Sequence, residues 1–233
     1  MKTTLIAIVP AAGIGSRALD SATKAQGLPK QYRLLGGQAM LRRSVQALLA
    51  DERIAQVRVA VAPDDIWASQ VLQGLPRTVC LPCGGPTRAD TVLNALQDLT
   101  PQIGQWVLVH DAARPGLPAQ ALSRLIDTCL QSGRGGLLAV PVPDTVKRSV
   151  AHDCPAVAGT VDREGLWLAQ TPQMFPAQAL CLALEQARSR GLPVTDEASA
   201  MELAGEQPLL INGSARNFKV TWPDDFELME KWL

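Results

Sequence analysis

A loop of small residues after a short apolar run is the part of this sequence best suited to chemistry. The run Leu5–Val9 leads into Pro10–Arg17, which reads PAAGIGSR. Small side chains let backbone N–H groups approach an anion, and the arginine that ends the loop adds positive charge. Further along, Pro29–Tyr32 (PKQY) contains a lysine that could fold back over the loop. Arg17 and Lys30 therefore predict a polyphosphate cradle, because cations held around developing phosphoryl charge are what phosphoryl transfer needs.

The same loop also satisfies a loose dinucleotide-binding pattern. Residues Gly13–Ala18 read GIGSRA and fit G-x-G-x-x-[G/A]. That pattern requires an acidic residue about 20 positions later. The corresponding stretch Gln31–Gly37 has no carboxylate, and Ser16–Gln26 lacks the apolar period of a helix. An NAD-binding oxidoreductase is therefore disfavoured.

Two later segments place small or charged residues where strands are expected to end. Val109–Pro115 (VHDAARP) contains Asp111, whose carboxylate could bind a hard divalent cation or a ribose hydroxyl, or could simply cap a turn. Asp111 and Arg114 flank small residues that leave space for a ligand. Gly84–Gly85 could let a flat base approach closely, or could form an ordinary turn.

Bulk composition limits the classes of partner. The 22 basic residues balance the 22 acidic ones, and only 4% of residues are aromatic, so we expect no nucleic-acid partner. No apolar run approaches the ~18 residues of a membrane span, so we expect no membrane partner and a cytoplasmic location. The pair Cys80 and Cys83 has no second pair or nearby histidine to complete a zinc site, so free thiols are the favoured interpretation.

Strand-like runs alternate with helical patterns along the chain. This order predicts an α/β fold, a single domain over residues 1–233 with a mostly parallel sheet flanked by helices. The expected strands are Leu5–Ala11, Val57–Ala62, Thr78–Leu81, Trp106–His110, Gly136–Val142 and Leu209–Asn212. The expected helices include Met40–Leu49 and Leu117–Leu130, and capping boxes are predicted at Thr87–Asp90 and Thr221–Asp224.

Residues 141–166 break this rhythm. They are short, polar and β-like, with prolines interspersed. We expect them to form a β arm that projects from the sheet. An isolated hairpin is marginally stable, so a partner subunit is the simplest candidate to pack against it, and we expect a homodimer.

Taken together, the motifs closely resemble the 2-C-methyl-D-erythritol 4-phosphate cytidylyltransferases of the non-mevalonate isoprenoid pathway. The matching segments follow the family's order and span nearly the whole chain. They are Pro10–Gly13 with Arg17, Pro29–Tyr32, Arg88–Asp90, His110–Pro115, Asp144–Thr145 with Lys147, Thr160–Arg163, Thr171–Gln173, Thr195–Ala200 and Lys219–Thr221.

The resemblance implies a Rossmann-like nucleotidyltransferase domain whose arm dimerises. It implies transfer of CMP from CTP to methylerythritol phosphate, with release of pyrophosphate and with Mg²⁺ held mainly by the CTP phosphates. Arg17, Lys30, Asp111 and Lys219 would be the catalytic residues, with Asp111 beside the ribose and the metal. Residues that would contact CTP are Pro10, Ala11, Ala12, Gly13, Gly15, Gly84, Gly85, Arg88, Thr91 and Ala112. Residues that would receive the sugar phosphate, beside Lys219, are Arg114, Thr145, Arg163 and Thr195.

Three features depart from the family pattern. The loop between Gly15 and Pro29 is longer than usual, and we expect Leu19–Leu28 to act as a lid over bound nucleotide. Pro86 stands where an acidic residue often helps to read the cytosine amino group, and Trp222 replaces a common basic residue. A ribitol 5-phosphate cytidylyltransferase and a non-catalytic nucleotide-binding regulatory module remain the alternatives.

Overall fold

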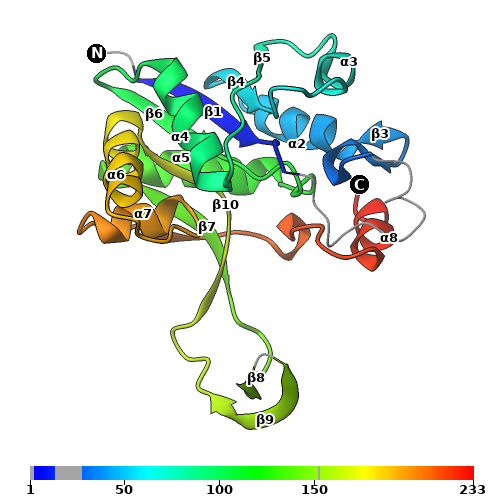
Figure 1. Cartoon of the computed structure of the whole chain (residues 1–233), viewed down its shortest axis with the longest axis vertical. Helices are drawn as coiled ribbons and strands as arrows, with labels where there is room; N and C mark the ends of the chain where they lie inside the picture. The colour runs from blue at the N-terminus through cyan, green and yellow to red at the C-terminus, as the bar shows by residue number, and fades with distance from the viewer. Residues whose placement is uncertain (1–2, 14–27, 152) are drawn as a thin grey trace.

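A seven-stranded sheet forms the centre of the molecule, in the order β11-β7-β10-β6-β1-β4-β5 (Figure 1). The structure is a computed structural model that describes residues 3–13, 28–151 and 153–233. The strands of this sheet are β1 (Thr4–Pro10), β4 (Ile54–Ala60), β5 (Thr78–Leu81), β6 (Gln105–Val109), β7 (Gly136–Pro141), β10 (Trp167–Pro176) and β11 (Leu209–Asn212). All neighbours pair in parallel except β10, which is antiparallel to both β6 and β7.

Helices cover both faces of the sheet because its central strands are apolar on both sides. Every side chain of Leu5–Val9 is buried. One core cluster joins the sheet to α2 (Met40–Leu49), α3 (Ala68–Leu72) and α5 (Ala119–Ser132). The other joins it to α4 (Arg88–Leu99), α6 (Ala177–Ser189) and α7 (Glu197–Leu203). The predicted fold class is confirmed.

Several short elements lie outside the seven-stranded sheet. They are the 3-10 turns η2 (Lys30–Tyr32) and η3 (Ala215–Asn217), the hairpin of β2 (Leu34–Leu35) and β3 (Gln38–Ala39), and helix α8 (Asp224–Glu230). A small core that includes Leu35, Val220 and Phe226 packs the hairpin, the segment before α8 and α8 together. The last segments of the chain therefore lie beside the loops that follow β1.

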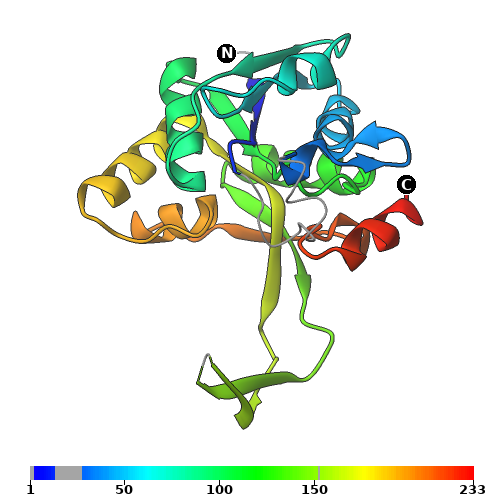
Figure 2. The ribbon, with the colours of Figure 1, turned by 45° about the vertical axis from the view of Figure 1, so that its right-hand side comes forward.

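The segment 141–166 leaves the sheet between β7 and β10. It contains the antiparallel pair β8 (Val146–Ala151) and β9 (Cys154–Val161), which lies far from the helical layers (Figures 1 and 2). Two of its apolar side chains are largely in solvent, since Val150 and Val157 are each 62% exposed. These two exposed valines have no apolar partner within the described chain.

The structure adds one strand to the predicted sheet and corrects one predicted helix cap. The long strand β10 was not predicted, and it makes the sheet mixed at its centre. The capping box at Thr221–Asp224 is wrong: α8 begins after Pro223, without a side-chain cap. The Asp225 carboxylate, one residue later, accepts hydrogen bonds from the backbone N–H groups of Thr221 and Trp222. The box at Thr87–Asp90 is present as predicted.

Candidate active site

A cavity of about 280 Å³ lies where the carboxyl ends of β1 and β6 meet the turn before α4. Ligands in open α/β sheets bind at this edge. The cavity brings together segments that are far apart in the sequence. Its lining residues are Pro10, Ala11, Ala12, Gly13, Lys30, Gln31, Gly85, Pro86, Thr87, Arg88, Thr91, Asp111, Ala112, Ala113 and Lys219.

The turn that carries Lys30 is fixed against the loop after β1. Buried Gln31 donates from Nε2 to the carbonyl of Ala11 at 2.8 Å. Tyr32 is also buried, and its hydroxyl donates to Asp65 Oδ2 at 2.5 Å. Lys30 Nζ donates to the carbonyl of Val220 at 2.7 Å. Val220 directly follows Lys219 in the chain, so this hydrogen bond holds Lys30 against the segment that carries Lys219. The turn that carries Lys30 therefore lies against Ala11, in the part of this loop that the structure describes.

The two glycines before α4 have different surroundings. A Cβ on Gly84 would lie 2.4 Å from the Cβ of Ala12 and 2.8 Å from the carbonyl oxygen of Val61. Gly84 is therefore required for close packing of the chain and does not line the cavity. Gly85 lines the cavity, and its N–H donates to the Thr91 hydroxyl at 3.0 Å. Pro86 lines the cavity too, so it offers no side-chain acceptor to a base there.

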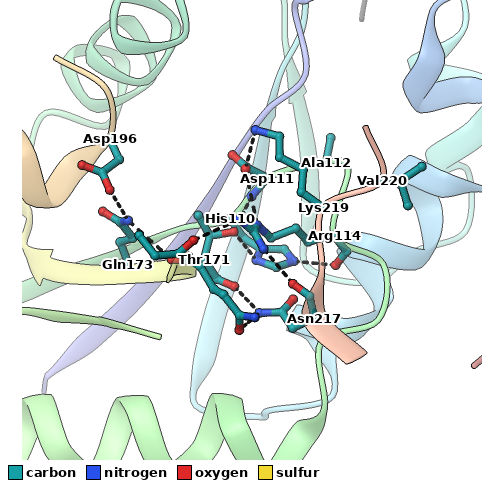
Figure 3. A network of polar contacts seen from close by, with 12 residues as sticks. His110, Asp111, Ala112, Arg114, Thr171, Gln173, Asp196, Asn217, Lys219 and Val220 are labelled. Carbon is teal, nitrogen blue, oxygen red and sulfur yellow. Dashed lines mark hydrogen bonds and ion pairs between the residues drawn. The ribbon is translucent and has the colours of Figure 1, made fainter. Parts of the chain in front are cut away.

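Asp111 is surrounded by positive charge. Its Oδ1 lies 2.9 Å from Arg88 Nε, and its Oδ2 lies 2.9 Å from Lys219 Nζ and 3.6 Å from Arg114 Nε. Figure 3 shows Lys219 extended toward this carboxylate. Burial alone would raise the pKa of Asp111, but the three cations outweigh burial and hold the pKa well below its usual range. Asp111 is therefore an anion that orders the cations at the cavity.

His110 supports this segment without facing the cavity. Its ring is fully buried, with Nε2 at 3.0 Å from the carbonyl of Arg114 and Nδ1 at 3.0 Å from the Thr171 hydroxyl (Figure 3). A carbonyl can only accept, so Nε2 carries the proton and Nδ1 accepts from Thr171. Burial lowers the pKa of His110 to about 4. The Thr171 oxygen also accepts from the N–H of Asp111 at 3.0 Å, which fixes the backbone there.

The predicted sugar-phosphate residues lie in three places. Arg114 is close to the cavity but donates to the carbonyls of Asn217 and Ala169. Thr145 and Arg163 belong to the arm, where Arg163 donates to the carbonyl of Pro143. Thr195 is exposed just before α7. Of the predicted acceptor residues, Lys219 is the one that lines the cavity.

Part of the predicted site lies outside the described residues. Gly15, Arg17 and residues 19–27 of the predicted lid are in this part of the chain. Trp222 is 57% exposed and does not line the cavity.

Sequence reasoning assigned no role to several residues that hold the site together. Gln31 and Thr171 fall within segments already singled out, so their polar side chains were a usable signal. Glu197 contacts Arg88 across 109 positions, and Asn217 contacts Thr171 across 46. One sequence offers no signal for such distant pairs.

Within the described residues, no cluster of three or more His, Cys, Asp or Glu side chains could hold a metal ion. Cys80 packs into the core on one face of the sheet and Cys83 into the core on the other, and both are free thiols. No described helix has the length and apolarity needed to cross a bilayer.

The fold and the site define a nucleotidyltransferase-type α/β protein, with lysines and an ordered carboxylate at the carboxyl ends of its strands. Residues 5–233 match the sequence model of the 2-C-methyl-D-erythritol 4-phosphate cytidylyltransferases (IspD). The chain belongs to this family.

Individual relatives match this chain over nearly its full length. The protein of that name from Bordetella pertussis is 64% identical over 233 residues, covering all of both chains. A crystal structure described as 4-diphosphocytidyl-2C-methyl-D-erythritol synthase superposes with a TM-score of 0.84 at 38% identity, covering 100% of this chain and 99% of the other. The Francisella tularensis cytidylyltransferase gives a TM-score of 0.83 at 33% identity, with 99% and 100% covered.

Proposed function

We propose that the cavity binds CTP and that the chain transfers CMP from CTP to 2-C-methyl-D-erythritol 4-phosphate. The product is 4-(cytidine 5'-diphospho)-2-C-methyl-D-erythritol, formed in isoprenoid precursor biosynthesis. One observation supports this most directly. In a chain of this family, two lysines from distant segments and the cation-bound Asp111 converge on a cavity walled by small residues.

The transfer needs positioning and charge neutralisation more than proton transfer. An ionised oxygen of the acceptor phosphate attacks the α-phosphorus of CTP. The bond from that phosphorus to the oxygen bridging the β-phosphate then breaks, and the electron pair leaves with pyrophosphate. No general base is required, and buried His110, with both ring nitrogens engaged, is not available as one. In-line positioning of the reactants and fixed cations around the phosphates provide the rate enhancement.

Roles can be proposed for the residues at the cavity. Lys30 and Arg17 would bind the triphosphate and stabilise the pentacoordinate α-phosphorus. Lys219 would turn from Asp111 toward phosphate, which its 39% exposed side chain permits. Backbone groups of Pro10–Gly13 and Gly85, with Thr91, would surround the nucleotide.

Mg²⁺ fits this site only as an ion that arrives with the triphosphate. Asp111 is the carboxylate that lines the cavity within the described chain, and both of its oxygens already face cations. Mg²⁺ often uses one or two carboxylates together with substrate phosphates. Asp111 could therefore take one position on the ion, which would offset phosphate charge when bound.

A direct assay tests the proposed reaction. Purified protein with CTP, Mg²⁺ and methylerythritol phosphate is expected to release pyrophosphate, and ribitol 5-phosphate is expected to give at least tenfold less. An assay that hydrolyses the released pyrophosphate and measures the phosphate follows the reaction with each acceptor, and CTP alone is the control. Faster release with ribitol 5-phosphate would support the alternative enzyme, and no release with either would support a non-catalytic nucleotide-binding module.

We also propose that the arm forms a homodimer. Val150, Val157 and Leu168 are each more than half exposed on or beside the arm, and a partner subunit would cover them. Such a partner could bring Thr145 and Arg163 to the neighbouring cavity.

A cytoplasmic location is also proposed. The free thiols fit the reducing cytoplasm, where CTP is available.

Introducing a charge on the arm tests the dimer. Val157→Asp is expected to convert a dimer to a single chain, because the interface would have to bury an unpaired carboxylate. Ile103→Asp, at a position 77% exposed outside the arm, is the control that should stay dimeric. Light scattering during size-exclusion chromatography measures both masses. A wild-type chain that elutes as a monomer would contradict the proposal.

A further inference from the structure

We infer that Glu197 is a positioning residue for the transfer reaction, acting through Arg88 to hold the Asp111 carboxylate in place. This inference rests on the proposed function, since it concerns how that site is kept ready for CTP. It also adds to the role expected of Arg88, which lines the cavity and links the two carboxylates.

Arg88 is held between two carboxylates. Its Nη1 and Nη2 donate to the two oxygens of Glu197 at 2.7 and 3.1 Å. Its Nε donates to Asp111 Oδ1 at 2.9 Å. Each of the three guanidinium nitrogens is thus already committed to a protein carboxylate. Burial alone would lower the pKa of Arg88, but Glu197 and Asp111 outweigh burial and raise it.

Glu197 is buried and lies behind Arg88, outside the lining of the cavity. Its side chain is 1% exposed and does not line the cavity, so it is not placed to touch a substrate there. Burying a carboxylate costs several kcal/mol unless it is well paired. The two-pronged contact with Arg88 meets that requirement and fixes the plane of the guanidinium, which a single hydrogen bond would leave free to turn.

The start of α7, which carries Glu197, is hydrogen-bonded to the sheet. Gln173, on the central strand β10, accepts from the N–H of Ala198 at 2.8 Å and donates to Asp196 Oδ2 at 2.8 Å. Figure 3 shows Gln173 pointing to Asp196 from the strand that also carries Thr171. The start of α7 is therefore tied to the same strand that fixes the backbone of Asp111.

The remaining partners of Asp111 explain why this anchor matters. Lys219 is 39% exposed and would be drawn away by substrate phosphate, and Arg114 Nε stays 3.6 Å distant. Arg88 is then the closest contact left to hold Asp111. Without Glu197, the guanidinium could rotate, and Asp111 would lose its fixed orientation as the nucleotide arrives.

Glu197→Gln tests the inference because it keeps the side-chain shape and removes the charge. We expect kcat/KM for CTP to fall about tenfold. Glu197→Asp keeps the charge but is too short to retain both hydrogen bonds, so its kcat/KM for CTP should fall less. This variant tests the inference if Glu197→Gln does not fold. Asp98→Asn is the matched control, since Asp98 lies on α4, the helix that begins at Arg88, and pairs with another arginine, Arg58, away from the cavity. It should retain wild-type kcat/KM.

A double-mutant cycle separates positioning from general destabilisation. If Glu197 acts through Asp111, adding Glu197→Gln to Asp111→Asn should cost less than twofold in kcat/KM. The inference would be overturned if the fold losses in kcat/KM of the two single variants multiply in the double variant. It would also be overturned if the Glu197→Gln enzyme has wild-type kcat/KM. In either case an active wild type leaves the proposed function standing, whereas a wild type that releases no pyrophosphate would contradict that function itself.

Discussion

Lys30→Ala is expected to lower kcat by about 10²-fold or more, the scale of losing one donor to transition-state charge. Lys30 lines the cavity, and the two residues that follow it, Gln31 and Tyr32, are buried and hydrogen-bonded, so its backbone is fixed before CTP binds. Negative charge on the bridging oxygen grows as the α-phosphorus bond breaks, so the loss should appear in kcat more than in KM. The same loss is expected for Arg17→Ala, because the loop motif places this second cation at the phosphates.

Steady-state kinetics of pyrophosphate release measure this effect. Lys231→Ala is a suitable control, because Lys231 is exposed after α8 and does not line the cavity. It should leave kcat unchanged. A Lys30→Ala enzyme with near-normal kcat would remove Lys30 from the mechanism.

The elements with clear periodicity were predictable from sequence. Helix α2 and the strands β5 and β11 have the predicted bounds, and β1, β4, β6 and β7 differ by a few residues at their ends. Their apolar runs are bounded by turn residues, so the pattern and the structure agree.

Strand β10 shows where pattern reasoning fails. A proline and the polar run Gln170–Gln173 argue against a central strand, because proline cannot donate to a ladder. Pairing with β7 is interrupted between Ala169 and Gln173, which leaves room for Pro172. The polar side chains are buried there because they hold the site: Thr171 contacts His110, and Gln170 contacts Asn217. These residues serve the site, and for that reason the segment lacks the apolar pattern of a buried strand.

Individual segments of the site were also predictable, but their mutual contacts were not. Lys30, Asp111 and Lys219 were singled out from their local motifs, and all three line one cavity. The ion pair of Arg88 with Glu197 depends on how α4 and α7 pack on the same face of the sheet. A local motif contains no information about such packing.

Asp111→Asn is expected to lower kcat/KM by about 10²-fold and to destabilise the fold by about 3–5 kcal/mol, the range for breaking a buried ion pair. The variant leaves Arg88 and Lys219 without the anion between them. Their mutual repulsion would then spread the cations that must converge on phosphate. Pyrophosphate release and urea unfolding measure the two losses.

The pH dependence of stability gives an independent check on the charge of Asp111. Its pKa is held below the usual value in the folded chain, while an unfolded aspartate titrates near ~3.9. The stabilisation from its charge is therefore complete above that unfolded pKa and is lost as pH falls toward the folded pKa. The difference in unfolding free energy between wild type and Asp111→Asn should be constant from about pH 7 to 5 and shrink below about pH 4. A difference that does not change with pH would mean that Asp111 stabilises the fold through packing, and its charge would then not be what orders the cations at the cavity.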